Sequence, residues 1–200
     1  MAKLTLDDIS EPRTYERERE DFRRRVIELK KKRRVHVGPF VTLLFENSQT
    51  MRFQIQEMAR AERIHTDEGI QAELDVYNPL VPDPGNLAAT LFLELTSEEE
   101  LREWLPKLVG IETRVWLVID APEGPIRIRC EVDPEHEKQL TREETTASVH
   151  YVHFHLTPEQ VDAFERFPVA VEVDHPAYTH WADLPPQSKA ELLSDLRNGG

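Results

Sequence analysis

The sequence predicts an α+β protein in which a helical N-terminal part packs on a mixed or antiparallel sheet of about five strands. Apolar residues recur at helical spacing as far as residue 77, and from residue 91 they alternate or run together as they do in strands. Pro82-Asp83-Pro84-Gly85 separates the two patterns. We therefore expect residues 1–82 to form the helical part. Residues 87–200 should form a sandwich-like α/β part with a C-terminal helix, packed with the first into one compact unit.

Three helices are expected before the Pro-Gly segment. The first covers residues 15–34, a second helical region follows Gly38-Pro39, and the third begins after Thr66, which is a favourable N-cap. Asn78-Pro79 ends the third helix, because proline disfavours helical backbone at the preceding residue. The apolar faces of the three are Tyr15, Phe22, Val26 and Leu29; Leu44, Met51, Ile55 and Met58; and Ile70, Leu74 and Tyr77.

The second region alternates strands with helices. Strands are predicted over residues 91–95, 115–119, 126–132, 149–156 and 169–174. Arg127, Arg129 and Glu131 alternate with apolar residues, so one face of their strand should contact water. A helix should follow Thr96-Ser97-Glu98-Glu99, and Leu192, Leu193 and Leu196 mark the last helix.

A weak internal repeat organises these elements. Leu95-Thr96-Ser97-Glu98-Glu99 is echoed by Leu156-Thr157-Pro158-Glu159-Gln160, each at the end of a strand and the start of a helix, and residues 118–122 are echoed by residues 172–176. The offset shrinks from 61 to 54 residues, so the second helix should be about two turns shorter. The resulting order, βαβ-β-βαβ, is that of a split-βαβ, ferredoxin-like sheet with one extra strand. Convergent capping chemistry would produce the same echo without duplication.

The charge balance favours some partners and disfavours others. The net charge is −13, yet residues 1–34 hold 12 Lys and Arg against 8 Asp and Glu. The remaining acidic body repels phosphate backbones, so nucleic acid is a disfavoured partner and proteins are better ones. Basic side chains of the first helix are the candidate partner-binding residues, with nucleic acid as the alternative ligand: Arg23, Arg24, Arg25, Arg33 and Arg34.

Cysteine content and hydropathy indicate the compartment. Cys130 is the only cysteine, which excludes an intramolecular disulfide. No apolar run reaches the ~18 residues of a membrane span, and the first residues do not form a signal peptide. We expect a cytoplasmic protein with protein partners or self-association and no membrane contact.

Histidines supply the candidate metal site. Five of the eight fall between residues 150 and 180, and His153 and His155 share one strand face, about 7 Å apart. Two imidazoles so placed suit zinc, iron or copper, with His175 as the expected third ligand and Asp174 or His180 as alternatives. An exposed or partner-facing sheet surface would show the same pattern.

Catalytic motifs are absent from the sequence. It contains no nucleophile elbow, Walker loop or dinucleotide fingerprint. Cys130 shares its face with Ile128 and Val132, which favours a buried thiol, and Glu62-Arg63-Ile64-His65 is one Glu-X-X-His where a di-iron bundle needs two. The balance is against catalysis, although the question of an enzyme stays open.

One segment resembles a known bacterial family. Gln54-Ile55-Gln56-Glu57-Met58 and Tyr77-Asn78-Pro79-Leu80-Val81-Pro82 resemble the core of the family described as domain of unknown function 3501, whose members have about this length. The family has no assigned catalytic residues to transfer. The resemblance implies an accessory role in iron or peroxide metabolism, because members tend to be encoded near rubrerythrin-like and iron–sulfur oxidoreductase proteins.

Overall fold

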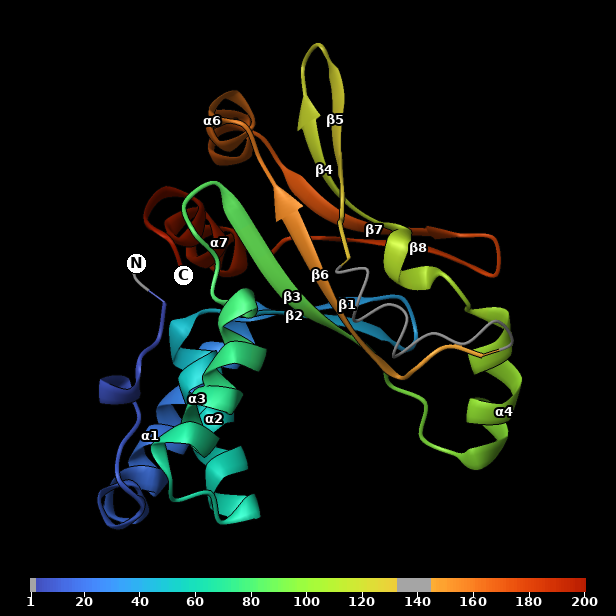
Figure 1. Cartoon of the computed structure of the whole chain (residues 1–200). Helices are drawn as coiled ribbons and strands as arrows, with labels where there is room; N and C mark the ends of the chain where they lie inside the picture. Colours follow the sequence, from blue (N-terminus) through green and yellow to red (C-terminus); the bar gives the residue numbers. More distant parts are fainter. Residues whose placement is uncertain (1–2, 133–144) are drawn as a thin grey trace.

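The computed structural model describes residues 3–132 and 145–200, which form two antiparallel four-stranded sheets and associated helices (Figure 1). Sheet A has the order β1-β2-β3-β6 and sheet B the order β5-β4-β7-β8. The strands of sheet A are β1 (Arg34–Val37), β2 (Val41–Phe45), β3 (Asn86–Leu93) and β6 (Val149–His155). Those of sheet B are β5 (Gly124–Arg129), β4 (Val115–Ala121), β7 (Val169–His175) and β8 (Tyr178–Asp183).

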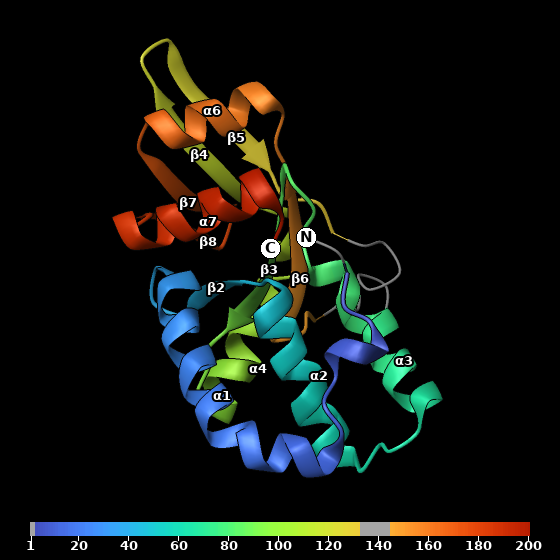
Figure 2. The same cartoon turned by 90° about the vertical axis from the view of Figure 1, so that its left-hand side faces the viewer.

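Helices surround the sheets on three sides. They are α1 (Pro12–Arg33), α2 (Ser48–Glu62), α3 (Asp67–Tyr77), α4 (Glu98–Lys107), α6 (Pro158–Arg166) and α7 (Pro186–Asn198), with short 3-10 turns at Leu6–Asp8, Asn78–Leu80 and Ile111–Thr113. Helices α1, α2 and α3 form a group beside sheet A, α6 and α7 lie side by side on one flank, and α4 lies on the opposite flank (Figures 1 and 2). Among the described residues, no helix has the length and apolar character needed to cross a membrane.

The predicted α+β class and helix-rich N-terminal part are confirmed. The described residues form eight strands in two sheets, however, and not about five strands in one. Residues 41–45 form β2, although Leu44 was expected on a helix. All five residues of β2 are buried, because the strand lies inside the sheet with both faces covered, so its sequence carries no alternation that would distinguish it from a helix.

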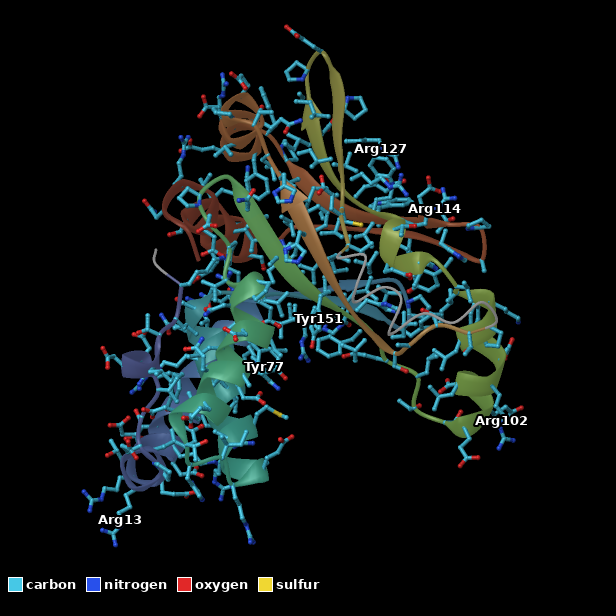
Figure 3. The ribbon with its side chains drawn as sticks, viewed as in Figure 1. Arg13, Tyr77, Arg102, Arg114, Arg127 and Tyr151 are labelled. Carbon is cyan, nitrogen blue, oxygen red and sulfur yellow. The ribbon has the colours of Figure 1, made fainter. Side chains whose placement is uncertain are left out.

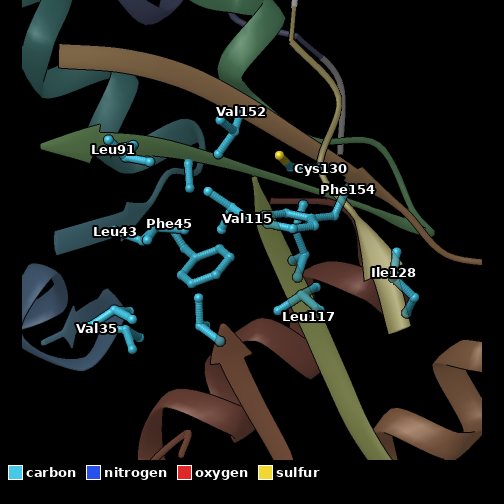
Figure 4. Close-up of a cluster of buried hydrophobic side chains, with 14 of the residues drawn as sticks. Val35, Leu43, Phe45, Leu91, Val115, Leu117, Ile128, Cys130, Val152 and Phe154 are labelled. Atoms are coloured by element: carbon cyan, nitrogen blue, oxygen red, sulfur yellow. The ribbon is translucent and has the colours of Figure 1, made fainter. Parts of the chain in front are cut away.

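The main hydrophobic core lies between the two sheets (Figure 4). Phe45 and Phe154 from sheet A meet Val115 and Leu117 from sheet B, all fully buried. The sheets also approach each other along both sides. Glu131 and His153 exchange two backbone hydrogen bonds of 2.8 Å, and the Tyr178 hydroxyl donates to the Val37 carbonyl at 2.6 Å. The first contact lies just beyond the end of β5 and the second is made by a side chain of β8, so the two contacts link the sheets but do not cover the backbone edge of β5.

The repeat has a structural counterpart. The units β3-α4-β4-β5 and β6-α6-β7-β8 each give their first strand to sheet A and their last two strands to sheet B. Equivalent strands are antiparallel neighbours, β3 with β6 and β4 with β7. The caps correspond as well, since Ser97 accepts from the Glu100 amide and Thr157 from the Gln160 amide.

Two details of the repeat differ from expectation. Helices α4 and α6 span 10 and 9 residues, so the second is one residue shorter and not two turns shorter; the 3-10 turn Ile111–Thr113 follows only the first. The helices also connect sheet A with sheet B, whereas a ferredoxin-like βαβ unit returns to the same sheet.

Candidate functional site: the open face of sheet B

Sheet B has one face in the core and one face that is open to solvent in the part of the chain that the structure describes. Along β4, Val115, Leu117 and Ile119 are buried, whereas the side chains between them point outward. We call the outward set the open face. It consists of Trp116, Val118 and Asp120 on β4, Pro125, Arg127 and Arg129 on β5, Ala170, Glu172 and Asp174 on β7, and Thr179, Trp181 and Asp183 on β8.

The strand register aligns these side chains in rows across the sheet. One row runs in the order Arg129, Trp116, Glu172 and Trp181. The row beside it runs in the order Arg127, Val118, Ala170 and Asp183. Directly opposite side chains on neighbouring strands are in contact distance, so each row forms a continuous strip.

Arg127 holds the centre of the open face together. Its guanidinium lies 4.7 Å from the centre of the Trp116 ring, and its Nη2 is 2.9 Å from the Glu172 carboxylate and 3.7 Å from that of Asp174. Arg129, which lies in the same row as Trp116, approaches this ring at 5.8 Å. The indole is therefore covered by two cations and keeps a fixed orientation. Figure 3 shows Arg127 and the exposed Arg114, which directly precedes β4, on this side of sheet B.

Trp181 is the most exposed large apolar side chain among the described residues. It is 72% exposed, whereas Val76, Ile27 and Leu6 are 48%, 40% and 37% exposed. Its strand neighbour on the face is Glu172. Leaving an indole in water forgoes the stabilisation that burial would give, and tryptophan and arginine are the residues that contribute most often to protein–protein binding.

Apart from Asp120 on β4, the two halves of the open face carry opposite charges. Arg127 and Arg129 lie on β5, and Arg114 borders β4. Glu172, Asp174 and Asp183 lie on β7 and β8. The face therefore passes from basic to acidic across its width, with Val118 and Ala170 between.

The predicted histidine pair is brought together, and the third histidine is not. His153 and His155 point to the outer side of sheet A, as expected, and His150 lies in the core. The Nδ1 of His155 is 2.6 Å from Oδ1 of Asn86, and its Nε2 is 3.5 Å from Glu131. The carboxylate beside the pair is thus Glu131, which the sequence did not single out.

His175 lies on the other sheet and faces the core. It is 7% exposed, its Nδ1 accepts from the Ala177 amide, and its Nε2 is 3.2 Å from the Val109 carbonyl. Both ring nitrogens are therefore occupied. Within residues 3–132 and 145–200, no group of three or more His, Cys, Asp or Glu is placed to hold a metal ion.

The basic residues of the first helix separate into two kinds. Arg23, Arg24 and Arg25 are exposed along α1, and Arg34 is exposed at the start of β1. Arg33 is fully buried, so it is not available to a partner. It pairs with Asp195 on α7 and donates to the carbonyls of Phe45 at 2.8 Å and Glu46 at 3.1 Å, and thereby ties α1 to α7 and to sheet A.

Cys130 is a core residue, as its alternation predicts. It is 5% exposed, its Sγ donates to the Glu112 carbonyl at 3.0 Å, and burial raises its pKa to about 11. The thiol is therefore protonated at neutral pH and is a poor nucleophile. Burial also lowers the pKa of His150, whose Nε2 lies 2.9 Å from Thr146 Oγ1.

A cavity of about 180 Å³ lies between the N-terminal segment and helices α1, α2 and α3. Several of its polar lining side chains are engaged with neighbours. The Tyr15 hydroxyl donates to Glu57 at 2.6 Å, Gln56 bonds the backbone of Ser10, and Arg60 pairs with Glu16. These bonds join α1 and the N-terminal segment to α2.

Sequence reasoning found one of the four strands of the open face. The alternation of Arg127 and Arg129 with apolar residues predicts the wet side of β5, and the structure confirms it. Trp181 was missed because β8 was not predicted. In β8 the exposed residues Thr179, Trp181 and Asp183 alternate with the less exposed His180 and Ala182. Such an alternation is typical of a strand with one face in water.

Comparisons with known proteins agree with this picture of a protein without an assigned activity. A solved structure described as a protein of unknown function from Burkholderia pseudomallei is 39% identical, with a TM-score of 0.87, and the match covers 98% of this chain and 100% of that one. No curated protein matches the chain. The family model described as protein of unknown function (DUF3501) matches residues 3–196. The chain therefore belongs to this family of bacterial proteins of unknown function.

Proposed function

We propose that the chain is a cytoplasmic accessory protein without catalysis of its own, which acts by binding another protein through the open face of sheet B. The observation that carries the proposal is Trp181, an indole left 72% exposed on the open face. The ordered Arg127–Trp116–Glu172 cluster beside it supports the proposal, because side chains already held in position lose little freedom on binding.

The form of the fold also supports binding by a face. The aromatic and charged side chains of the open face come from all four strands of sheet B. Exposed tryptophan and arginine side chains with charged surroundings are typical of surfaces that bind proteins.

Site-specific photo-cross-linking tests the proposal. A photoreactive phenylalanine analogue replaces Trp181 in the full chain, and the matched control places it at Val76, which is 48% exposed on α3. The proposal expects a discrete protein adduct from position 181 in the cells that encode the chain, and none of the same mass from position 76. Absence of a discrete adduct from position 181 would refute it.

A second candidate is transition-metal binding at His153 and His155, which share one face of β6. Because an amide oxygen only accepts, the hydrogen bond to Asn86 puts the proton of His155 on Nδ1 and leaves the lone pair on Nε2. Two imidazoles are ligands that zinc or iron accepts, and within residues 3–132 and 145–200 no third His, Cys, Asp or Glu is placed to complete the site. Elemental analysis of protein purified without an affinity tag tests this candidate.

A further inference from the structure

The charge pattern of the open face is self-complementary. Its basic residues lie on β5 and at the start of β4, and its acidic residues lie on β7 and β8 except for Asp120, which lies on β4. Arg114 and Asp183 are both exposed, and neither side chain has an ion-pair partner within the described part of the chain. A surface with these properties fits a copy of itself that is turned around, because each half then meets its opposite.

Building on the proposed binding role of this face, we propose that its partner is a second copy of the chain. The two open faces meet about a two-fold axis that runs parallel to the strands, over the line between β4 and β7. This axis places β5 opposite the partner's β8 and β4 opposite the partner's β7, and it keeps every row in line with the same row of the other copy.

The row register then pairs side chains of suitable chemistry. Arg127 lies opposite the partner's Asp183, and Arg129 lies opposite the partner's Trp181. Val118 and the partner's Ala170 meet next to the axis. The ion pair and the arginine–indole contact each occur twice in the dimer, so both exposed indoles are covered and both Asp183 carboxylates acquire a cation.

Arg114 adds a third contact. Its carbonyl accepts from the Asp174 amide, so the two residues belong to one row, on β4 and β7. The axis therefore brings Arg114 to the partner's Asp174. A two-fold axis perpendicular to the strands would instead place β5 on β5 and the arginines against each other, which like-charge repulsion disfavours.

The size of the face sets the expected affinity. Four strands at about 4.8 Å spacing and about 20 Å of strand length give a footprint of roughly 400 Å² per copy. Both copies together then bury roughly 800 Å², which is below the ~1,200 Å² of standard specific interfaces, so the dimer should be weak and transient and should dissociate at roughly 100 μM. Self-association is expected to depend on concentration and to weaken with salt.

Sedimentation velocity of the full chain from about 1 to 500 μM tests the dimer. Trp181→Ala, Arg127→Glu and Asp183→Arg should each raise the dimer Kd about tenfold or more. The double variant Arg127→Glu with Asp183→Arg restores opposite charges across the interface, and should bind tighter than either single variant. Val76→Ala and Arg13→Glu, exposed on α3 and α1, are the controls and should leave the Kd unchanged.

Each outcome decides the matter. A concentration-dependent dimer that follows the variants as described supports the proposal. A chain that stays monomeric to 500 μM, or a dimer that ignores all three substitutions, overturns it. The cross-link at position 181 separates this failure from failure of the proposed function. An adduct with a different protein alone excludes the self-complex and keeps the binding role, whereas no adduct removes both.

Discussion

Replacing Arg33 by methionine should destabilise the fold by about 3–5 kcal/mol. The side chain is fully buried, and the substitution removes its pairing with Asp195 and its donors to the carbonyls of Phe45 and Glu46. Each carbonyl left without a donor costs about 1–3 kcal/mol, and the unpaired buried carboxylate adds to this. The methionine recovers part of the loss by filling the volume with apolar atoms.

The pH dependence of this effect has a defined sign. Burial raises the pKa of Asp195, and the charge of Arg33 opposes that rise. Without Arg33 the pKa rises further, so the folded variant binds a proton more tightly than the unfolded chain does. A carboxyl whose pKa is raised in the folded state lowers the free energy of unfolding as the pH increases through that pKa. The loss of unfolding free energy caused by Arg33→Met should therefore be largest at neutral pH and should shrink on acidification.

Urea denaturation measures the free energy of unfolding of the wild type and of the variants Arg33→Met, Asp195→Leu and the double. The double variant should recover the part of the stability loss that comes from the unpaired Asp195 charge. It should keep the part that comes from the two carbonyls left without donors. Arg34→Met is the matched control and should stay within about 0.5 kcal/mol of wild type, because Arg34 is exposed. A loss below about 1 kcal/mol for Arg33→Met, or equal losses for both arginines, would refute the reasoning.

Three further predictions concern other parts of the chain. Cys130 should react with a thiol reagent at pH 8 at least about 100-fold more slowly in the folded protein than in urea, since its pKa is about 11; comparable rates would contradict its burial. Ser97→Ala and Thr157→Ala should each lower the unfolding free energy by about 1 kcal/mol, because each removes an N-cap; a change of less than a few tenths would show that the caps are not used. Protein purified without a tag should retain zinc or iron if the histidine pair binds metal, and His153→Ala with His155→Ala should remove it; unchanged substoichiometric metal would end that candidate.

The helices and strands that could be predicted from the sequence are those with one buried face and one exposed face. Tyr15, Phe22 and Val26 lie on one side of α1 among charged residues, so the helix and its buried face could be predicted, and all three are buried. Likewise, His150 was correctly separated from His153 and His155 by alternation alone. The hairpin of β1 and β2 could not be predicted, because β2 is buried on both faces. Its sequence therefore has no alternation of apolar and polar residues that would indicate a strand.

Long-range partners could not be predicted from local pattern. Arg33 belongs to a run of basic residues, and such runs usually indicate a surface exposed to solvent. It forms a buried ion pair because Asp195 on α7, more than 150 residues away in the sequence, packs against it. The number of sheets depends on whether the strand that follows α4 or α6 joins the same sheet as the strand before it or a second sheet. The local spacing of apolar residues carries no information about this. The open face shares this property, since Trp116 and Trp181 meet Glu172 only through the pairing of three strands.

The antiparallel pairing of equivalent strands in the two repeat units bears on how the protein is held together. Because β3 is bonded to β6 and β4 to β7, the hydrogen bonds that join the units run between the halves of the chain. Fragments covering residues 1–132 and 145–200 would carry complementary strands, and each would expose edges that only the other satisfies. Such fragments should reassemble when they are mixed.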